Sequence, residues 1–166
     1  FQTTHKGNQP SFEIYGPGGV ELGEFWEQNR LQSFAGVAVL GFPNLFLTAG
    51  PYSGGFNWFA MLETHLRHIM DCLFHAWRTD QTRIEVNAEV YRAYMDTMWA
   101  LSERTVFKSG QCTGARSYYI DRHGDASLPS PRTPVQRERR VRRRTIEDFD
   151  FGRCPAQGPT ASSRHS

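Results

Sequence analysis

The most regular hydrophobic pattern in the chain lies between residues 57 and 78. Apolar side chains recur there at spacings of three and four residues, which is the period of one helix face, at Leu62, Leu66, Ile69, Leu73 and Trp77. Asn57 precedes this stretch, and an Asn side chain can accept hydrogen bonds from the first amides of a helix. The pattern therefore predicts an amphipathic helix that begins after Asn57 and buries this stripe.

A second helix is predicted from about Asn87 to Ser102. Its apolar stripe has the same period and consists of Val90, Tyr91, Tyr94, Met95, Met98 and Leu101. The two helices are separated by a polar break at residues 78–82. Because this connection is short, we expect the helices to form an antiparallel pair, a helical hairpin.

Residues 45–48 are apolar on both sides of the chain rather than alternating. Such a short run suits a strand of a parallel sheet that helices cover on both faces. Gly50 and Pro51 would end this strand, and Gly54-Gly55 would form a loop that can approach a ligand closely, because neither residue carries a Cβ atom. The sequence therefore predicts an α/β protein in which a buried strand leads through a glycine-rich loop into the first long helix.

The remaining segments are less regular. Residues 21–26 favour one or two helical turns, and residues 12–15 and 117–121 each suit a short strand. Pro129, Pro131 and Pro134 are expected to exclude regular structure around them. From Gly152 onward the residues are small and polar, so we expect a folded part over residues 1–151 and a disordered tail over residues 152–166.

Composition narrows the functional classes. The chain has 166 residues, enough for one domain with a core, and no apolar run approaches the ~20 residues that span a bilayer. Its three cysteines are widely separated, which argues against a disulfide framework or a zinc site and favours a reducing cytoplasm. His65, His68 and His75 have no acidic residue at a metal-ligand spacing, so we expect them on exposed helix surface and predict no metal site.

Positive charge is concentrated in residues 132–144. This basic run holds seven arginines and one glutamate, whereas the whole chain has a net charge of only +2. The run suits either a helix or an extended arm, and it could bind the phosphates of nucleic acid. No aromatic residues or reader motif accompany it, so a segment that packs on the domain or is simply solvated is favoured. A small basic module that contacts nucleic acid through this run is kept as the alternative function.

Several strings of residues appear in an order and spacing that resemble a known family. Each string alone is weakly specific. They are Gly41-Phe42-Pro43-Asn44-Leu45-Phe46 with Gly50-Pro51, then Met61-Leu62-Glu63-Thr64-His65-Leu66, then Cys112 and Arg116-Ser117-Tyr118-Tyr119-Ile120-Asp121 with Gly124, and finally the basic run with Thr145 and Asp148-Phe149. Together they resemble the flavin-dependent monooxygenases, the Baeyer–Villiger type especially, over about residues 1–151.

This resemblance implies a fold and a chemistry. Phe1 falls where the family has just completed its Ala-Thr-Gly motif, and neither of the two Gly-x-Gly-x-x-Gly phosphate cradles is present. We therefore expect a fragment, the C-terminal portion of a Rossmann-like FAD-binding domain with a helical hairpin and an irregular C-terminal segment. The parent enzyme would use FAD and NADPH to insert one oxygen atom from O₂ into a small organic substrate, a ketone or a heteroatom compound. The fragment would need the missing N-terminal part and be inactive alone.

The resemblance also implies site residues. The flavin-facing set is Gly50, Pro51, Gly55, Phe56, Asn57 and Trp58, and Tyr118 stands where the Baeyer–Villiger branch has a Trp that reaches the nicotinamide cofactor. Physical reasoning points to the same loop, because α/β proteins bind cofactors between a parallel strand and the following helix. The free amides and dipole of that helix would favour a reduced, anionic flavin by about 0.3–1 kcal/mol. The alternatives are an ordinary capped strand–loop–helix and a packing role for Tyr118. No catalytic residue is predicted.

Overall fold

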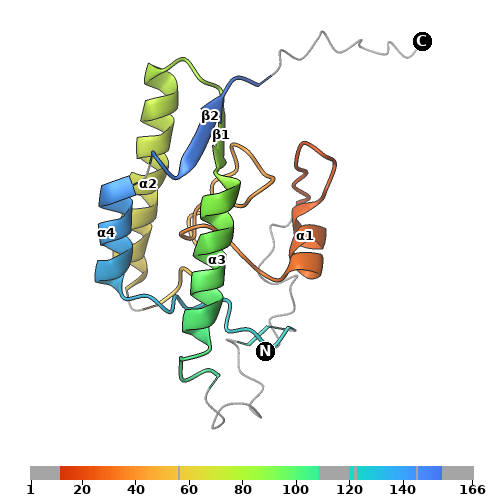
Figure 1. The fold of residues 1–166 in the computed structure, drawn as a ribbon, viewed down its shortest axis with the longest axis vertical. Coiled ribbons are helices and arrows are strands. Elements are labelled where there is room, and N and C mark those ends of the chain that lie inside the picture. Colours follow the sequence, from red (N-terminus) through yellow and green to blue (C-terminus); the bar gives the residue numbers. More distant parts are fainter. Residues whose placement is uncertain (1–11, 56, 109–119, 122, 145, 155–166) are drawn as a thin grey trace, which may run out of the picture.

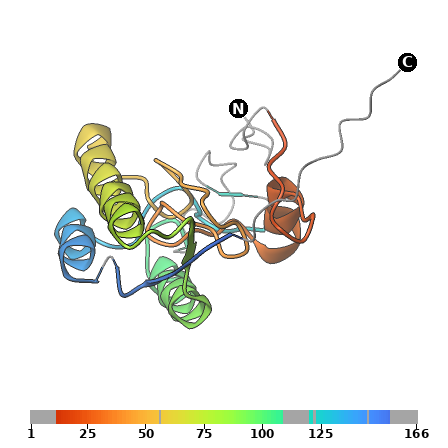
Figure 2. The same ribbon diagram turned by 90° about the horizontal axis from the view of Figure 1, so that it is seen from above.

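The computed structural model describes residues 12–55, 57–108, 120–121, 123–144 and 146–154 (Figure 1). Two long helices, two shorter helices and two short strands surround a central region of loops. In both views α1 lies at one side of the molecule and α4 at the other, with α2 beside α4 (Figures 1 and 2). The elements are α1 (Leu22–Asn29), α2 (Trp58–Arg78), β1 (Arg83–Val86), α3 (Ala88–Ser102), α4 (Pro134–Arg144) and β2 (Phe149–Gly152).

Both predicted long helices, α2 and α3, are present, but strand β1 lies in their connection and α2 packs on α4 rather than directly on α3. Helices α2 and α3 run in opposite directions (Figure 1), and each begins after an asparagine whose side chain caps it. The Asn57 Oδ1 atom accepts hydrogen bonds from the Phe59 and Ala60 amides at 3.0 and 3.4 Å. The Asn87 Oδ1 atom accepts from Glu89 and Val90 in the same way, at 3.0 and 3.2 Å. Side-chain capping therefore fixes both helix starts where the sequence places them.

Strand β1 lies in the connection between these helices and forms a two-stranded antiparallel sheet with β2, which follows α4. Strand β1 pairs with β2 in a register that places Arg83 opposite Gly152 and Val86 opposite Phe149. Neither strand was predicted from the sequence, and Gly152 was expected in the disordered tail. Gly152 is the last residue of β2, while residues 155–166 lie outside the described residues. The mixed helix-and-strand class is as predicted.

The predicted parallel strand at residues 45–48 is wrong. This segment is a loop: the Leu47 amide donates to the Val37 oxygen of another loop at 2.9 Å, and just before the segment the Asn44 amide donates to the Ile84 oxygen of β1 at 2.8 Å. Asn44 itself has φ +62, a left-handed turn conformation that asparagine tolerates. The apolar run is explained by burial, because Leu45 and Leu47 pack beside Phe42 in a small core cluster.

The main core lies between the loop of residues 33–40, the inner sides of α2 and α3, and the small sheet. Phe34 is fully buried at its centre, 4.9 Å from the Tyr94 ring and 5.8 Å from the Phe149 ring between ring centroids. A second cluster joins α1 to the neighbouring loops through Leu22, Trp26, Leu31, Val39 and Phe42. The loops are therefore part of the core and not only connections between helices.

Helix α2 buries a different face from the predicted one. The buried residues are Met61, His65, His68, Ile69, Cys72 and Ala76, whereas Leu66, Leu73 and Trp77 of the predicted stripe are exposed. The expectation of exposed histidines is likewise wrong for His65 and His68, because the core supplies partners for them. The His65 Nδ1 atom lies 2.5 Å from the Thr48 carbonyl oxygen, and the His68 ring packs edge-on against Phe34 and Phe149.

The basic run forms helix α4. Pro134 is its first residue, so the expectation that prolines exclude regular structure is wrong here; the first helical position tolerates proline because its amide needs no partner. Thr133 and Gln136 form a reciprocal cap in which the Gln136 amide donates to Thr133 Oγ1 and the Thr133 amide donates to Gln136 Oε1. Among the described helices, none is long and apolar enough to cross a membrane.

Candidate functional site

The first half of the predicted flavin loop is packed inside the protein. Gly50 is buried, its amide donates to the Gly36 oxygen at 2.9 Å, and a Cβ atom there would lie 2.8 Å from that oxygen. The carbonyl oxygen of Gly50 accepts a short hydrogen bond from Ser53 Oγ, and that of Pro51 accepts one from Ser33 Oγ at 2.6 Å. Only glycine fits this close contact, so Gly50 and Pro51 hold the loop in place.

Tyr52 continues this packed segment in an uncommon backbone conformation. It is buried, its φ is +60°, and its amide donates to the Ser127 oxygen at 2.6 Å. The left-handed region is uncommon for a bulky residue. The Tyr52 side chain fills the core, and burial raises the pKa of its hydroxyl.

The loop is held from its other side by residues 125–130. Gly54 forms an isolated parallel bridge with Pro129, and its amide donates to the Leu128 oxygen at 2.8 Å. Asp125 is buried and accepts two hydrogen bonds from the Arg30 guanidinium, at 2.6 and 2.7 Å. Burial raises the pKa of Asp125, but Arg30 and then Lys108 outweigh it and hold that pKa below its ordinary value.

The second half of the predicted loop is exposed at the start of α2. Gly55 has φ +126, a conformation open to glycine, and no protein atom lies within 4 Å of a Cβ placed there. Asn57 is exposed, and Trp58 begins α2. Phe56 and Tyr118 lie outside the described residues. The Asn57 side chain already binds the Phe59 and Ala60 amides. These two amides are therefore not free to bind a ligand, contrary to the expectation of free amides at this helix start.

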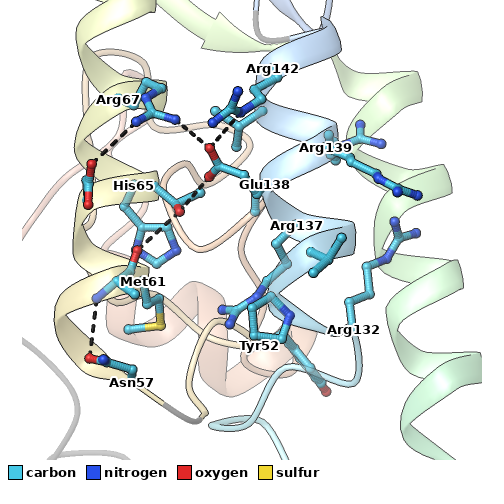
Figure 3. A pocket seen from close by; sticks show the side chains of 18 of the residues that line it. Tyr52, Asn57, Met61, His65, Arg67, Arg132, Arg137, Glu138, Arg139 and Arg142 are labelled. Carbon is cyan, nitrogen blue, oxygen red and sulfur yellow. Dashed lines mark hydrogen bonds and ion pairs between the residues drawn. The ribbon is translucent and has the colours of Figure 1, made fainter.

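A cavity of about 710 Å³ extends from this helix start along the groove between α2 and α4 (Figure 3). Tyr52, Asn57 and Met61 line its lower end, and α2 and α4 together supply most of its wall. Six arginines and two glutamates line it: Arg67, Arg132, Arg137, Arg139, Arg140, Arg142, Glu63 and Glu138. The basic run signalled charge in the sequence, but the cavity was not predicted because it needs the pairing of two helices that are distant along the chain.

Glu138 is the electrostatic centre of the upper part of this cavity. Figure 3 shows it between Arg67 and Arg142. It accepts from Arg142 Nε at 2.9 Å, from Thr64 Oγ1 at 2.8 Å and from Arg67. The hydrogen bond from Arg142, with help from Thr64 and Arg67, holds the pKa of Glu138 below its ordinary value. This carboxylate joins α2 to α4 and neutralises part of the basic run.

Of the two buried histidines of α2, His65 lines the cavity and His68 does not. Burial lowers the pKa of His65, and it lowers that of His68 to about 4. No described residue forms a hydrogen bond with either ring nitrogen of His68, and its apolar surroundings favour the neutral form of the ring. Among the described residues, no three His, Cys, Asp or Glu side chains are grouped as a metal site.

Comparison with curated proteins finds monooxygenases, although no protein-family model matches the chain. A Baeyer–Villiger monooxygenase of Pseudomonas aeruginosa is 29% identical over 113 residues, which cover 67% of this chain and 21% of that protein. A cyclohexanone 1,2-monooxygenase of Acinetobacter sp. is 26% identical over 105 residues, covering 63% of this chain and 19% of that protein. A phenazine N-monooxygenase of Lysobacter antibioticus is 31% identical over 104 residues, which cover 63% of this chain and 19% of that protein.

Solved structures of the same kind share the fold. Cyclohexanone monooxygenase from Rhodococcus sp. Phi1, bound to NADP⁺, matches 90% of this chain and 28% of its own with a TM-score of 0.73 at 21% identity. An oxidised steroid monooxygenase bound to NADP matches 86% of this chain and 26% of its own with a TM-score of 0.70, also at 21% identity. The chain spans about a fifth of the length of the curated relatives named above. The chain therefore has homologues among the Baeyer–Villiger monooxygenases, and it aligns with one part of their polypeptide.

Proposed function

We propose that this chain supplies the flavin-facing loop and helix start of an FAD- and NADPH-dependent monooxygenase. The whole enzyme would insert one oxygen atom from O₂ into a small organic substrate, a ketone or a heteroatom compound. The observation that carries the proposal is the agreement between the homologous relatives and an exposed, glycine-containing loop at the start of α2. A free buried thiol at Cys72 fits a reducing, cytoplasmic setting.

The residues present fit a planar cofactor edge at this place. Gly55 is exposed and leaves open space where a side chain would stand. Asn57 is exposed beside it, at the positive end of the α2 dipole. Gly55, Phe56, Asn57 and Trp58 would therefore face the flavin, while Gly50 and Pro51 hold the loop from behind. Tyr118 remains proposed as a contact to the nicotinamide cofactor.

The bound cofactor would supply the redox chemistry, and this chain would supply placement and electrostatics. The dipole of α2 would favour negative charge on a flavin atom near Asn57, with a contribution of about 0.3–1 kcal/mol. That contribution tunes a cofactor but is too small to hold it. We therefore propose that the 166-residue chain alone neither retains FAD nor oxidises NADPH.

Two measurements test this. In ¹H–¹⁵N spectra of the chain, adding riboflavin or FAD should shift the amide signals of Gly55, Asn57 and Phe59. The signals of Glu89 and Val90, at the equally capped start of α3, serve as the matched control. Equal shifts at both helix starts, or none at α2, would refute the flavin contact. Gel filtration of the chain with FAD should give colourless protein, and a yellow protein peak would refute the proposed loss of retention.

A further inference from the structure

The cavity between α2 and α4 contains more positive charge than its own carboxylates neutralise. Arg67 and Arg142 share Glu138, and Arg140 pairs with Asp148 at 3.0 Å. Arg132 and Arg137 line the same cavity and form no ion pair with a carboxylate of the described residues. Arg139 also lines the cavity without a carboxylate partner among the described residues, but it is exposed, so the half-buried part of the uncompensated charge lies on Arg132 and Arg137.

Both of these guanidinium groups are half-buried, which makes the absence of a counter-charge costly. Arg137 Nη1 donates to the Ser53 carbonyl oxygen, while the buried Nε atoms of Arg132 and Arg137 have no hydrogen-bond partner. Burial lowers the pKa of Arg137. In Figure 3 the Arg137 side chain points from α4 toward Tyr52 and the start of α2, and Arg132 comes from the segment just before α4.

The Tyr94 ring restricts the orientation of Arg132 and of the neighbouring Arg140. The Arg132 and Arg140 guanidinium carbons lie over the Tyr94 ring at 5.7 and 5.2 Å from its centroid. Tyr94 is buried and cannot rotate freely, so stacking on its face restricts both side chains before any ligand arrives. A preorganised guanidinium loses less side-chain entropy when it binds an oxyanion.

The rest of the cavity lining is mainly apolar, apart from Asn57, Thr64 and His65. Ala35, Ala60, Met61, Pro134, Val135 and Val141 line it between the charged groups. The volume of about 710 Å³ is within the range of small-molecule sites. A bare inorganic anion would leave this apolar surface unused, whereas an anion attached to an apolar or aromatic body would cover it.

We propose that the α2–α4 cavity binds a phosphate-bearing small molecule with an aromatic or apolar body, whose phosphate is held by Arg132 and Arg137. This site goes beyond the flavin contact: it uses the α4 wall, whereas the flavin contact uses the exposed loop at Gly55. Guanidinium groups bind phosphate through paired, charge-assisted hydrogen bonds. The terminal Nη atoms of the two guanidinium groups would be the donors for this, because the Nε atoms have almost no accessible surface.

Calorimetric titration of the 166-residue chain at fixed ionic strength tests the site with phenyl phosphate and inorganic phosphate as probes. Phenyl phosphate should bind about tenfold more tightly than inorganic phosphate, because its ring covers the apolar wall. Arg137→Gln and Arg132→Gln should each weaken phenyl phosphate binding about tenfold or more. The control variant Arg153→Gln, which removes an exposed arginine outside the cavity, should change it less than about twofold.

The Arg137→Lys variant keeps the positive charge, so its comparison with Arg137→Gln separates loss of phenyl phosphate binding from loss of folding. Each variant is first checked for an unchanged circular dichroism spectrum, and Arg132→Gln does not disturb the Arg137–Ser53 contact. Absence of phenyl phosphate binding to the parent chain would overturn the proposal. So would equal binding by the Arg132, Arg137 and Arg153 variants, or equal binding of the two probes. Riboflavin has no phosphate. The change that riboflavin causes in the Gly55 amide signal therefore tests the flavin contact independently of these titrations.

Discussion

The two sides of helix α2 contrast in a way that its sequence does not suggest. The side that faces the core carries His65, His68 and Cys72 beside Ile69. The side that faces outward carries large apolar residues that nothing among the described residues covers, namely Phe59, Leu66, Met70, Leu73, Phe74 and Trp77. The more hydrophobic face is therefore the exposed one, and continuous apolar surface of this kind is typical of an interaction face.

What decides the orientation of α2 is the shape and the polar atoms of the core. The loop of residues 33–50 supplies the Thr48 carbonyl oxygen that contacts His65 and the Phe34 ring that packs against His68. Gly36 of the same loop approaches so closely that a Cβ atom there would lie 2.9 Å from His65 Nε2. Hydrophobicity alone would turn the helix the other way. The inner face is thus selected by fit, and the more apolar outer face is exposed among the described residues.

The largest expected effect tests whether the inner face carries the stability. Phe34→Ala removes the ring at the centre of the core and should lower the free energy of unfolding by about 3–5 kcal/mol in urea titrations. Phe74→Ala removes the same side chain from the outer face, where 55% of it is exposed, and should change stability by less than about 1 kcal/mol. Similar losses for both variants would remove the contrast between the two faces.

Acid should affect the inner face through His68. Its pKa falls from an ordinary 6.5 to about 4 in the folded protein because burial favours the neutral ring. The unfolded chain therefore binds a proton more readily, and stability that is present above pH 6.5 should be lost as the pH falls to about 4, by roughly 3 kcal/mol. His65 acts in the same direction. His68→Leu should flatten the pH dependence of the unfolding midpoint, whereas His75→Gln, on a half-buried residue, should keep it; an unchanged slope in His68→Leu would contradict this account.

The capped start of α2 should contribute less than the core face. Asn57→Ala removes the acceptor for two amides and should cost about 1 kcal/mol. Asn87→Ala removes the equivalent cap of α3 and provides a matched comparison by thermal unfolding. A loss of several kcal/mol for Asn57→Ala alone would mean that this residue does more than cap a helix.

The smallest change in stability is expected on the outer face. Leu66→Gln with Leu73→Gln should alter the free energy of unfolding by less than about 0.5 kcal/mol per site. The same pair should reduce self-association in sedimentation measurements, because it breaks up exposed apolar surface. A clear loss of stability would show that this face already packs against protein.

The sequence predicted the parts of this structure that local rules determine. Both long helices follow from a three-to-four periodicity and an asparagine cap, and motif order alone indicated the family. The orientation of α2 could not be predicted, because the partners of His65 and His68 come from a loop whose path is not encoded in periodicity. The prediction of a strand at residues 45–48 was wrong because a buried loop and a buried strand can have the same apolar composition.

The flavin-facing role of the residues around the start of α2 stays a prediction. Gly55 and Asn57 are exposed there, whereas Gly50 is buried against the Gly36 oxygen. The cavity beside α4 was missed because it depends on the pairing of Thr64 and Arg67 with Glu138, more than seventy residues further along the chain. Long-range pairing of this kind leaves no mark in a local pattern.

The pairing of β1 with β2 has a consequence for synthesis of the protein. Strand β2 contributes Phe149 to the ring cluster around Phe34, so the core is completed by one of the last described residues. A ribosome releases the chain from its N-terminal end, and domains fold only when their contacts have emerged. Until residue 152 leaves the exit tunnel, β1 has an unpaired edge and Phe34 lacks one of its neighbours. Folding of this region is therefore delayed until residues 149–152 have emerged, more than one hundred residues after Phe34.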